Sequence, residues 1–275
     1  AELPEKGSFK STYIGDTPVV VTRGQDDEIY AWVNRCAHRG AEICRERHGK
    51  SEDGAYTCVY HQWAYDAKGD LHGVPFQRGL AGKGGMPKDF DKKKHGLRKV
   101  RVVNYHGAIF GTFSDDTPDI EEYMGDDVSY HMRRLLNKPI EILGTTRQYI
   151  KGNWKFYAEN TKDPYHASLL HLFHATFGLY RSSQQGESIV NNKVHCLIWV
   201  KSSEEKKSAL DDVKKENLRT MQQGNYALAD ESLLAGQQEF EDGHSLDILS
   251  MFPSLVLQQI QNTLAFRQIL PKGKD

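Results

Sequence analysis

The chain has few cysteines, no excess of positive charge and no long hydrophobic run. Its 275 residues include four cysteines, and 36 Lys and Arg residues oppose 37 Asp and Glu residues, for a net charge of −1. Without a general basic field, the chain is not expected to bind nucleic acid. Its apolar runs are far shorter than the roughly 20 residues of a membrane-spanning helix. These absences favour a globular protein that acts without a membrane or a nucleic-acid partner.

The cysteines indicate metal binding rather than disulfide bonds. The first residues, Ala1–Lys6, contain no apolar stretch of the kind that a secretory signal needs. Cys36 and Cys58 each lie close to a histidine, which favours metal ligation in a reducing, cytoplasmic location. Cys44 and Cys196 have no Cys or His at ligand spacing, so they are predicted to be buried free thiols.

The first part of the chain, residues 1–116, is predicted to be a small antiparallel β domain. It contains short β-branched and aromatic runs separated by Gly and Asp turns. The predicted strands are 19–22, 29–33, 56–60, 97–103 and 108–113. The Gly-rich segment 79–87 lacks the Gly-Lys-Ser/Thr ending of a phosphate-binding loop, and a surface loop is predicted there.

The second part, residues 117–275, is predicted to mix helices and strands. Thr117-Pro118-Asp119 is a typical helix start and marks the predicted domain boundary. Helices are predicted at 118–124, 126–136, 153–161 and 165–177, and strands at 139–150, 196–200, 246–252 and 255–270. Within residues 201–242, surface helices with one buried face are predicted from Leu210, Val213, Leu218 and Met221. The predicted fold class is therefore α+β.

Cys36-Ala-His38 and Cys58-Val-Tyr-His61 form the first cluster of metal-ligand residues. Each pair follows a predicted strand, where a loop can present both side chains. Zinc sites usually pair Cys with Cys and His with His at longer spacings. One Cys and one His from each loop suit a [2Fe-2S] cluster in which two thiolates bind one iron and two imidazoles bind the other. Zinc binding and a core without metal remain the alternatives.

Asp163, His166 and His171 form the second cluster. Two histidines and a carboxylate are the donor types of non-haem iron sites that keep positions open for dioxygen and substrate. On an ideal helix the two histidines would be about 140° apart and would not share a face. An irregular helix near Pro164 is therefore expected, with a pair of core histidines as the alternative. The remaining histidines are predicted to be structural or exposed: His48, His72, His95, His106, His131, His174, His195 and His244.

Both clusters resemble motifs of one enzyme family. Cys36-x-His-Arg-Gly40 and Cys58-x-Tyr-His-x-Trp63 resemble the Rieske domain of the large (α) subunits of aromatic-ring-hydroxylating oxygenases. The run from Glu159 to His171, Glu-Asn-x-x-Asp-x-Tyr-His followed by His, is similar to their catalytic motif. The resemblance covers nearly the whole chain and is greatest for the branch that acts on aromatic acids, such as terephthalate and anthranilate dioxygenases and salicylate hydroxylase. It implies a Rieske domain at 1–116 followed by a helix-grip catalytic domain at 117–275, in which helices cover a large antiparallel sheet.

The resemblance also implies residue roles. His166 and His171 would bind the mononuclear iron, and Asn160 would lie near it. Asp163 would link this site to a cluster histidine of a neighbouring subunit. The family's third iron ligand, an aspartate, comes from a much later segment, so the chain is expected to be incomplete at both ends. The carboxylates considered as replacements lie in no matching context, and none is named as the ligand: Asp230, Asp242 and Asp247.

The implied reaction is hydroxylation of an aromatic ring with dioxygen and with electrons from NAD(P)H, delivered by a reductase with or without a ferredoxin. The implied assembly is α3 or α3β3. A carboxylate substrate suggests Arg181 or Arg267 in the pocket, although exposed arginines are common. Phe177, Leu257 and Ile260 could line the pocket, with ordinary core as the alternative. The rival functions are an electron carrier without a working mononuclear site, a demethylating monooxygenase and a zinc-binding structural module.

Overall fold

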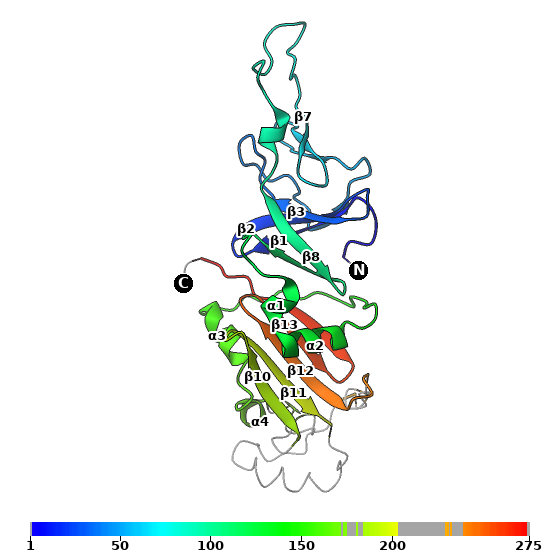
Figure 1. The fold of residues 1–275 in the computed structure, drawn as a ribbon, viewed down its shortest axis with the longest axis vertical. Coiled ribbons are helices and arrows are strands. Elements are labelled where there is room, and N and C mark those ends of the chain that lie inside the picture. The colour runs from blue at the N-terminus through cyan, green and yellow to red at the C-terminus, as the bar shows by residue number, and fades with distance from the viewer. Residues whose placement is uncertain are drawn as a thin grey trace. The chain divides into compact units, whose positions relative to one another are not determined.

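The computed structural model describes residues 2–171, 173–174, 180, 184–202, 229–230, 232 and 239–273. The chain forms two compact units, which are shown as ribbons in Figure 1. Unit 1 consists of residues 1–120, 138–148 and 270–274, and unit 2 of residues 121–137, 149–269 and 275. Within the described residues, no helix has both the length and the hydrophobicity that crossing a membrane requires.

Unit 1 is built from two antiparallel sheets. A six-stranded sheet has the order β4-β1-β2-β3-β8-β9, and a three-stranded sheet has the order β5-β6-β7. Val20 on β2 pairs with Trp32 on β3, and both side chains are fully buried. The elements are β1 (Ser8–Ile14), β2 (Thr17–Arg23), β3 (Ile29–Val33), β4 (His48–Lys50), β5 (Tyr56–Thr57), β6 (Ala64–Tyr65), β7 (Leu71–Gly73), the short 3-10 helix η1 (Lys92–His95), β8 (Lys99–Tyr105) and β9 (Ala108–Thr112).

Local turn chemistry explains two features of unit 1. His106 and Gly107, at φ 50° and 90°, form the two-residue turn between β8 and β9, so the strands predicted at 97–103 and 108–113 pair as a hairpin. The strand predicted at 56–60 is wrong beyond Thr57, because the chain turns into a tight loop at Cys58.

The described part of unit 2 contains one antiparallel sheet of five strands, which follow one another in chain order. Leu197, Leu249 and Leu257 stand opposite one another on three neighbouring strands, and all three are fully buried. The strands are β10 (Gly186–Asn191), β11 (His195–Lys201), β12 (His244–Met251), β13 (Leu255–Ile260) and β14 (Thr263–Gln268). The helices are α1 (Ile120–Met124), α2 (Asp126–Leu135), α3 (Trp154–Asn160) and α4 (Ala167–Leu170).

Helix α2 covers part of this sheet. It contacts β10, β11 and β12. Val128, Met132 and Leu135 recur at helical spacing and are buried, which explains why this face packs against the strands. Two units built from antiparallel sheets with few helices confirm the predicted α+β class.

Two strand predictions in the second part are wrong. Residues 139–150 form no strand; Ile140 and Ile142 alternate, but both are exposed and no neighbouring strand pairs with them. The strand predicted at 255–270 is two strands, because the chain reverses at Gln261, which has φ 54°. The helices predicted from Leu210, Val213, Leu218 and Met221 lie outside the described residues.

Candidate metal centres

The two Cys/His loops of unit 1 share one hydrogen-bond pattern. The Cys36 N–H donates to the Ala41 carbonyl, and the Cys36 carbonyl accepts the Gly40 N–H, both at 2.8 Å. The Cys58 N–H donates to the Trp63 carbonyl, and the Cys58 carbonyl accepts the Gln62 N–H, both at 2.9 Å. The residue four positions after each cysteine has a positive φ, 73° at Gly40 and 56° at Gln62. Both loops therefore fold tightly around the cysteine backbone and turn the following histidine outward.

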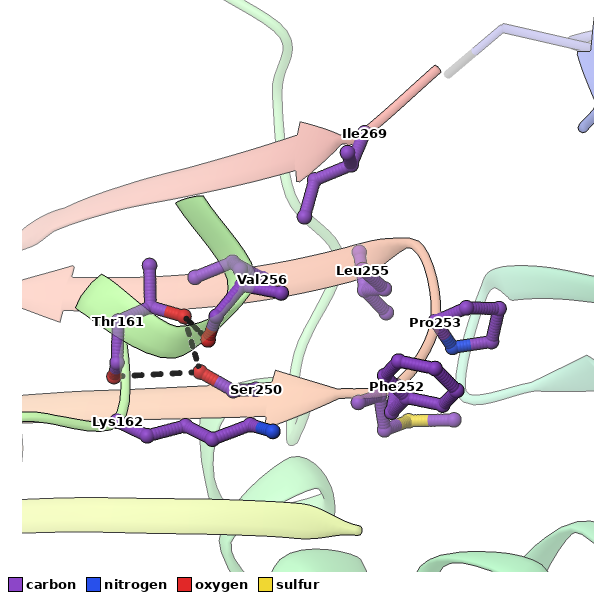
Figure 2. Close-up of a pocket in the computed structure, with 10 residues that line it drawn as sticks. Thr161, Lys162, Ser250, Phe252, Pro253, Leu255, Val256 and Ile269 are labelled. Atoms are coloured by element: carbon purple, nitrogen blue, oxygen red, sulfur yellow. Dashed lines mark hydrogen bonds between the residues drawn. The ribbon is translucent and has the colours of Figure 1, made fainter. Parts of the chain in front are cut away.

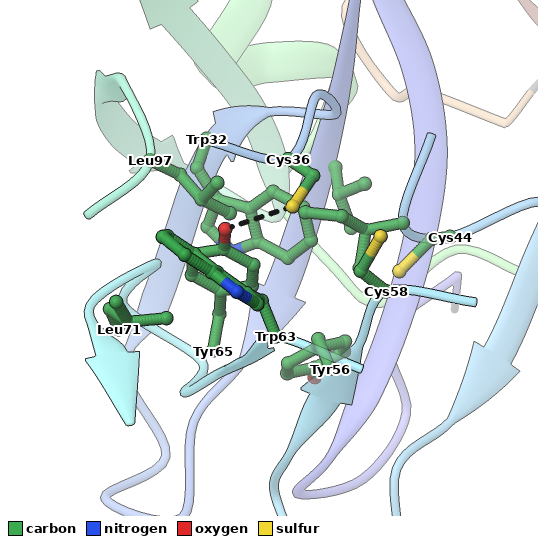
Figure 3. Packing of buried hydrophobic residues seen from close by; sticks show 11 residues of the cluster. Trp32, Cys36, Cys44, Tyr56, Cys58, Trp63, Tyr65, Leu71 and Leu97 are labelled. Atoms are coloured by element: carbon green, nitrogen blue, oxygen red, sulfur yellow. Dashed lines mark hydrogen bonds between the residues drawn. The ribbon is translucent and has the colours of Figure 1, made fainter. Parts of the chain in front are cut away.

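Burial divides the four predicted cluster ligands into two pairs. Cys36 and Cys58 are 4% and 2% exposed and lie in the core of unit 1 (Figure 3), and neither forms a disulfide. His38 and His61 are exposed, and their ring centroids lie 4.7 Å apart. A [2Fe-2S] cluster whose inner iron takes two thiolates and whose outer iron takes two imidazoles needs this division. The side chains fit that group.

Two neighbouring residues support the loops. Trp63, which is buried, stacks on the His38 ring at 5.0 Å with planes 14° apart. The buried Asn34 side chain accepts the N–H groups of Ile43 and Cys44 at 3.0 Å and donates to the Cys44 carbonyl at 2.7 Å. The sequence pattern did not predict this role of Asn34. Its only signal was a polar residue between an apolar strand and a cysteine.

The second predicted centre lies around α4 in unit 2. This helix has only four residues; His166 is its N-cap and His171 its C-cap, with φ −84° and ψ 73°. The expected distortion near Pro164 is therefore confirmed. Of the helix predicted at 165–177, α4 forms residues 167–170, the helix is interrupted at His171, residues 173–174 are helical again, and residues 172 and 175–177 lie outside the described residues. Because neither histidine is held inside a regular helix, the two rings can turn toward each other.

The His166 and His171 rings face each other with their Nε2 atoms. Their Nε2 atoms are 3.1 Å apart, and the Asn160 amide nitrogen lies 3.3 Å from His166 Nε2. Two lone pairs would repel at this distance, so the pair needs a proton or a metal between them. Two nitrogens that bind one metal at adjacent positions lie about 3 Å apart when each bond is about 2.1 Å long. The pair fits a single iron, for which imidazole is a suitable ligand.

Asp163 orients the first of these rings. Its Oδ2 lies 3.1 Å from His166 Nδ1, and its Oδ1 accepts the Tyr165 N–H at 2.8 Å. The Tyr165 N–H, and then His166, lower the pKa of Asp163, so the carboxylate is ionised and can accept both bonds. Desolvation, and then the nearby His166, lower the pKa of His171. A neutral His171 ring offers the lone pair that a metal requires.

No third carboxylate joins the pair among the described residues. Among the described residues, one group of His, Cys, Asp or Glu side chains has at least three donor atoms within 4.8 Å of one another. It consists of His131, His244 and Asp247. The histidines of this group had been predicted to be structural or exposed, and their convergence was missed because they are far apart in the sequence. The two other carboxylates considered bind other partners: Asp242 accepts from the Arg134 guanidinium, and Asp230 accepts the Ser232 N–H.

Comparison with known proteins places this geometry in a family. Residues 1–83 match the Rieske [2Fe-2S] domain, and residues 121–275 match the catalytic domain of the ring-hydroxylating alpha subunit. The chain belongs to the ring-hydroxylating α-subunit family. This family's catalytic domain binds mononuclear iron, in agreement with the facing histidine pair.

Individual relatives agree with this membership. All of this α-subunit chain aligns at 52% identity with 64% of the anthranilate 1,2-dioxygenase large subunit of Burkholderia cepacia. Almost all of it, 99%, aligns at 49% identity with 65% of subunit alpha 2 of the terminal oxygenase component of terephthalate 1,2-dioxygenase from Comamonas sp.. The chain thus spans a little under two thirds of these relatives. Naphthalene 1,2-dioxygenase from Rhodococcus sp. shares the fold, with a TM-score of 0.71 at 22% identity over 97% of this chain and 60% of that one.

Tyr65 contacts one of the predicted cluster ligands, Cys36, in this α-subunit chain. Its hydroxyl accepts the Ala37 N–H at 3.0 Å and lies 3.2 Å from Cys36 Sγ, the contact drawn in Figure 3. Burial, and then the contact with Cys36, raise the pKa of Tyr65, so the hydroxyl keeps its proton. Burial, and then the nearby Glu42, raise the pKa of the Cys44 thiol to about 12. Cys44 and Cys196 are buried free thiols, as predicted.

Tyr65→Phe is expected to lower the reduction potential of the cluster. A hydrogen bond to a sulfur ligand favours the more negative, reduced state. Losing about 1 kcal/mol of that preference would lower a one-electron potential by roughly 40 mV. The test is a redox titration followed by EPR. Tyr30→Phe, at a half-buried tyrosine bonded to Asp26 in the same unit, is the control and should leave the potential unchanged. An unchanged or higher potential in Tyr65→Phe would contradict the assignment.

Strand β12 anchors the end of α3 beside the histidine pair. Ser250 Oγ lies 2.9 Å from Thr161 Oγ1 and 3.3 Å from the Thr161 carbonyl (Figure 2). The small pocket around this contact is also lined by apolar side chains, including Phe252 and Val256. Of the substrate-pocket residues suggested from the sequence, Leu257 is core and Arg267 donates to the Tyr157 hydroxyl at 3.2 Å. Ile260 is half-buried, and Phe177 and Arg181 lie outside the described residues.

Ser250→Ala is expected to lower the free energy of unfolding of unit 2 by about 1 kcal/mol, because it removes a half-buried hydrogen bond. Chemical denaturation followed by circular dichroism measures the change. Ser254→Ala, in the turn just after β12, is the control and should have a smaller effect. Equal stability of the Ser250 variant and the parent would show that this contact does not hold α3 to the sheet.

Proposed function

We propose that this chain belongs to a terminal oxygenase that hydroxylates the ring of an aromatic carboxylic acid with dioxygen. The observation that carries the proposal is the facing pair His166 and His171, with Nε2 atoms 3.1 Å apart, in a chain that also holds the Cys/His loops. The named relatives support the substrate class. Besides the anthranilate and terephthalate enzymes, the large oxygenase component of salicylate 5-hydroxylase from Ralstonia sp. is 39% identical.

The proposed residue roles follow from the two sites. Cys36, Cys58, His38 and His61 would hold the [2Fe-2S] cluster, and His166 and His171 would hold the mononuclear iron. When bound, the cluster stores one electron and the iron activates dioxygen. Asp163 accepts the Nδ1–H of His166 and keeps its Nε2 free for the metal. The Asn160 amide faces the same nitrogen and borders the space where the substrate would react.

The assembly and the electron source are part of the proposal. We place the domain boundary between residues 116 and 117. Electrons would come from NAD(P)H through a reductase, in a cytoplasmic α3 or α3β3 oxygenase. Asp163 would lie where one subunit meets the next.

The deciding experiment uses the complete oxygenase that contains this chain. The purified protein should be red-brown, with the EPR signal of a reduced Rieske cluster. With a reductase, NADH and dioxygen it should hydroxylate anthranilate, terephthalate or salicylate. Naphthalene, an aromatic ring without a carboxylate, is the matched control and should react much more slowly. A colourless protein with stoichiometric zinc would rule out the oxygenase. A cluster that is reduced without any product would favour an electron carrier, and formaldehyde from a methoxybenzoate would favour a demethylase.

A further inference from the structure

A second group of metal-ligand side chains lies in unit 2, on elements other than those of the iron pair. His131 is on α2, and His244 and Asp247 are on β12. Their donor atoms lie within 4.8 Å of one another. His131 and Asp247 are 6% and 0% exposed, and His244 is half-buried. Nothing in the proposed oxygenase reaction uses this group.

The carboxylate of Asp247 lies between the two imidazole rings. Its Oδ2 is 2.7 Å from His131 Nδ1, and its Oδ1 is 2.9 Å from His244 Nδ1. Both rings therefore point the same nitrogen at one carboxylate. Two imidazoles and a carboxylate are the donor set of many zinc and other transition-metal sites.

The side chains around the group carry more negative than positive charge when both histidines are neutral. Arg134 also lies 3.1 Å from Asp247 Oδ2, but its other guanidinium nitrogens bind both oxygens of Asp242. This two-pronged pair satisfies the guanidinium. With neutral histidines, Asp242, Asp247 and Arg134 together carry one excess negative charge next to a fully buried carboxylate. Because Asp247 is fully buried and shares Arg134 with Asp242, a metal cation bound at Asp247 would be stabilising there.

Neighbouring side chains hold the group in place. Trp199 stacks on His244, with ring centroids 4.9 Å apart and planes 25° apart. The fully buried Gln259 accepts from Arg134 at 2.7 Å and donates to the His244 carbonyl at 3.2 Å. Such outer contacts fix the orientation of ligand side chains before a metal binds.

We propose that His131, His244 and Asp247 bind one divalent transition-metal ion, represented by zinc, at a structural site that joins α2 to β12. The three donors suit zinc in type, and the ion supplies the positive charge that the buried carboxylate lacks. Because the ligands come from an N-terminal helix of unit 2 and a strand far along the chain, the ion would tie α2 to the sheet and stabilise unit 2.

Zinc binding tests the site in the cluster-loaded complete protein. A His166→Ala, His171→Ala background prevents zinc from occupying the iron pair. After equilibrium dialysis against zinc chloride, elemental analysis should find one zinc per chain in addition to the cluster iron. His244→Gln and His131→Gln should each weaken this binding at least about 10-fold. His195→Gln, which replaces a buried histidine on the neighbouring strand β11, is the matched control and should retain the zinc.

Two further measurements distinguish this site from misplaced zinc. X-ray absorption should show nitrogen and oxygen ligands without sulfur, which excludes zinc at Cys36 and Cys58. Zinc at roughly 100 times its dissociation constant should raise the melting temperature of unit 2 by about 5–10 °C, and circular dichroism should show each variant folded. Absence of the extra zinc, or its retention in both His244→Gln and His131→Gln, would overturn the proposal; a proton would then balance Asp247. Loss of hydroxylation alone would bear on the proposed function and not on this site.

Discussion

His166→Ala is expected to remove the mononuclear iron and lower aromatic hydroxylation by at least about 1,000-fold, since a metal-dependent reaction loses its reactive centre. The Rieske absorption and EPR signals should stay unchanged. The two outcomes separate because His166 belongs to unit 2, whereas the Cys/His loops belong to unit 1. Iron analysis, product formation with a reductase, and EPR of the dithionite-reduced protein measure the three quantities on one sample.

The controls for this variant come from the same segment. His171→Ala should match His166→Ala, because the two Nε2 atoms face each other at 3.1 Å. His174→Ala removes a half-buried ring whose centroid lies 5.7 Å from that of His171, and it should keep most of the iron. If the His166 variant retained both iron and turnover while the His174 variant lost them, the ligand pair would be misassigned.

The Cys/His loops could be predicted from the sequence because their information is local. Each cysteine and its histidine are separated by one or two residues, so both lie in the same tight loop. The same holds for the break in the helix near Pro164, since a proline and a five-residue spacing both act over one or two helical turns. For these features the sequence pattern agrees with the local backbone, and the metal-ligand roles of the residues stay predictions.

The remaining features depend on partners far away in the chain. Ile140 and Ile142 alternate like a strand, but alternation cannot supply a neighbouring strand, and none pairs with them. Gln261 adopts a left-handed conformation, at φ 54°, that non-glycine residues seldom adopt, and Gln261-Asn262 is not one of the Asn-Gly or Asp-Gly pairs that mark a two-residue hairpin turn. His131 and Asp247 are 116 residues apart, so only the packing of α2 against the sheet reveals their contact.

Asp163→Asn is expected to weaken iron binding at the histidine pair by roughly 10- to 100-fold, the usual effect of removing a residue that orients a metal ligand. Asp163 now accepts two hydrogen bonds, from Tyr165 N–H through Oδ1 and from His166 Nδ1 through Oδ2. Asparagine has one acceptor and one donor, so it can satisfy only one of them. If its NH2 group faces His166, the ring must carry its proton on Nε2, and the metal loses that ligand.

The measurement is the iron dissociation constant of the Asp163→Asn protein, together with kcat and KM for an aromatic acid. Asp163→Glu retains a carboxylate with two acceptor oxygens and should recover part of the affinity. A purely structural defect would lower the melting temperature of both variants equally and would not distinguish Asn from Glu. Equal iron affinity and equal kcat in Asp163→Asn and the parent protein would show that Asp163 orients neither His166 nor the metal.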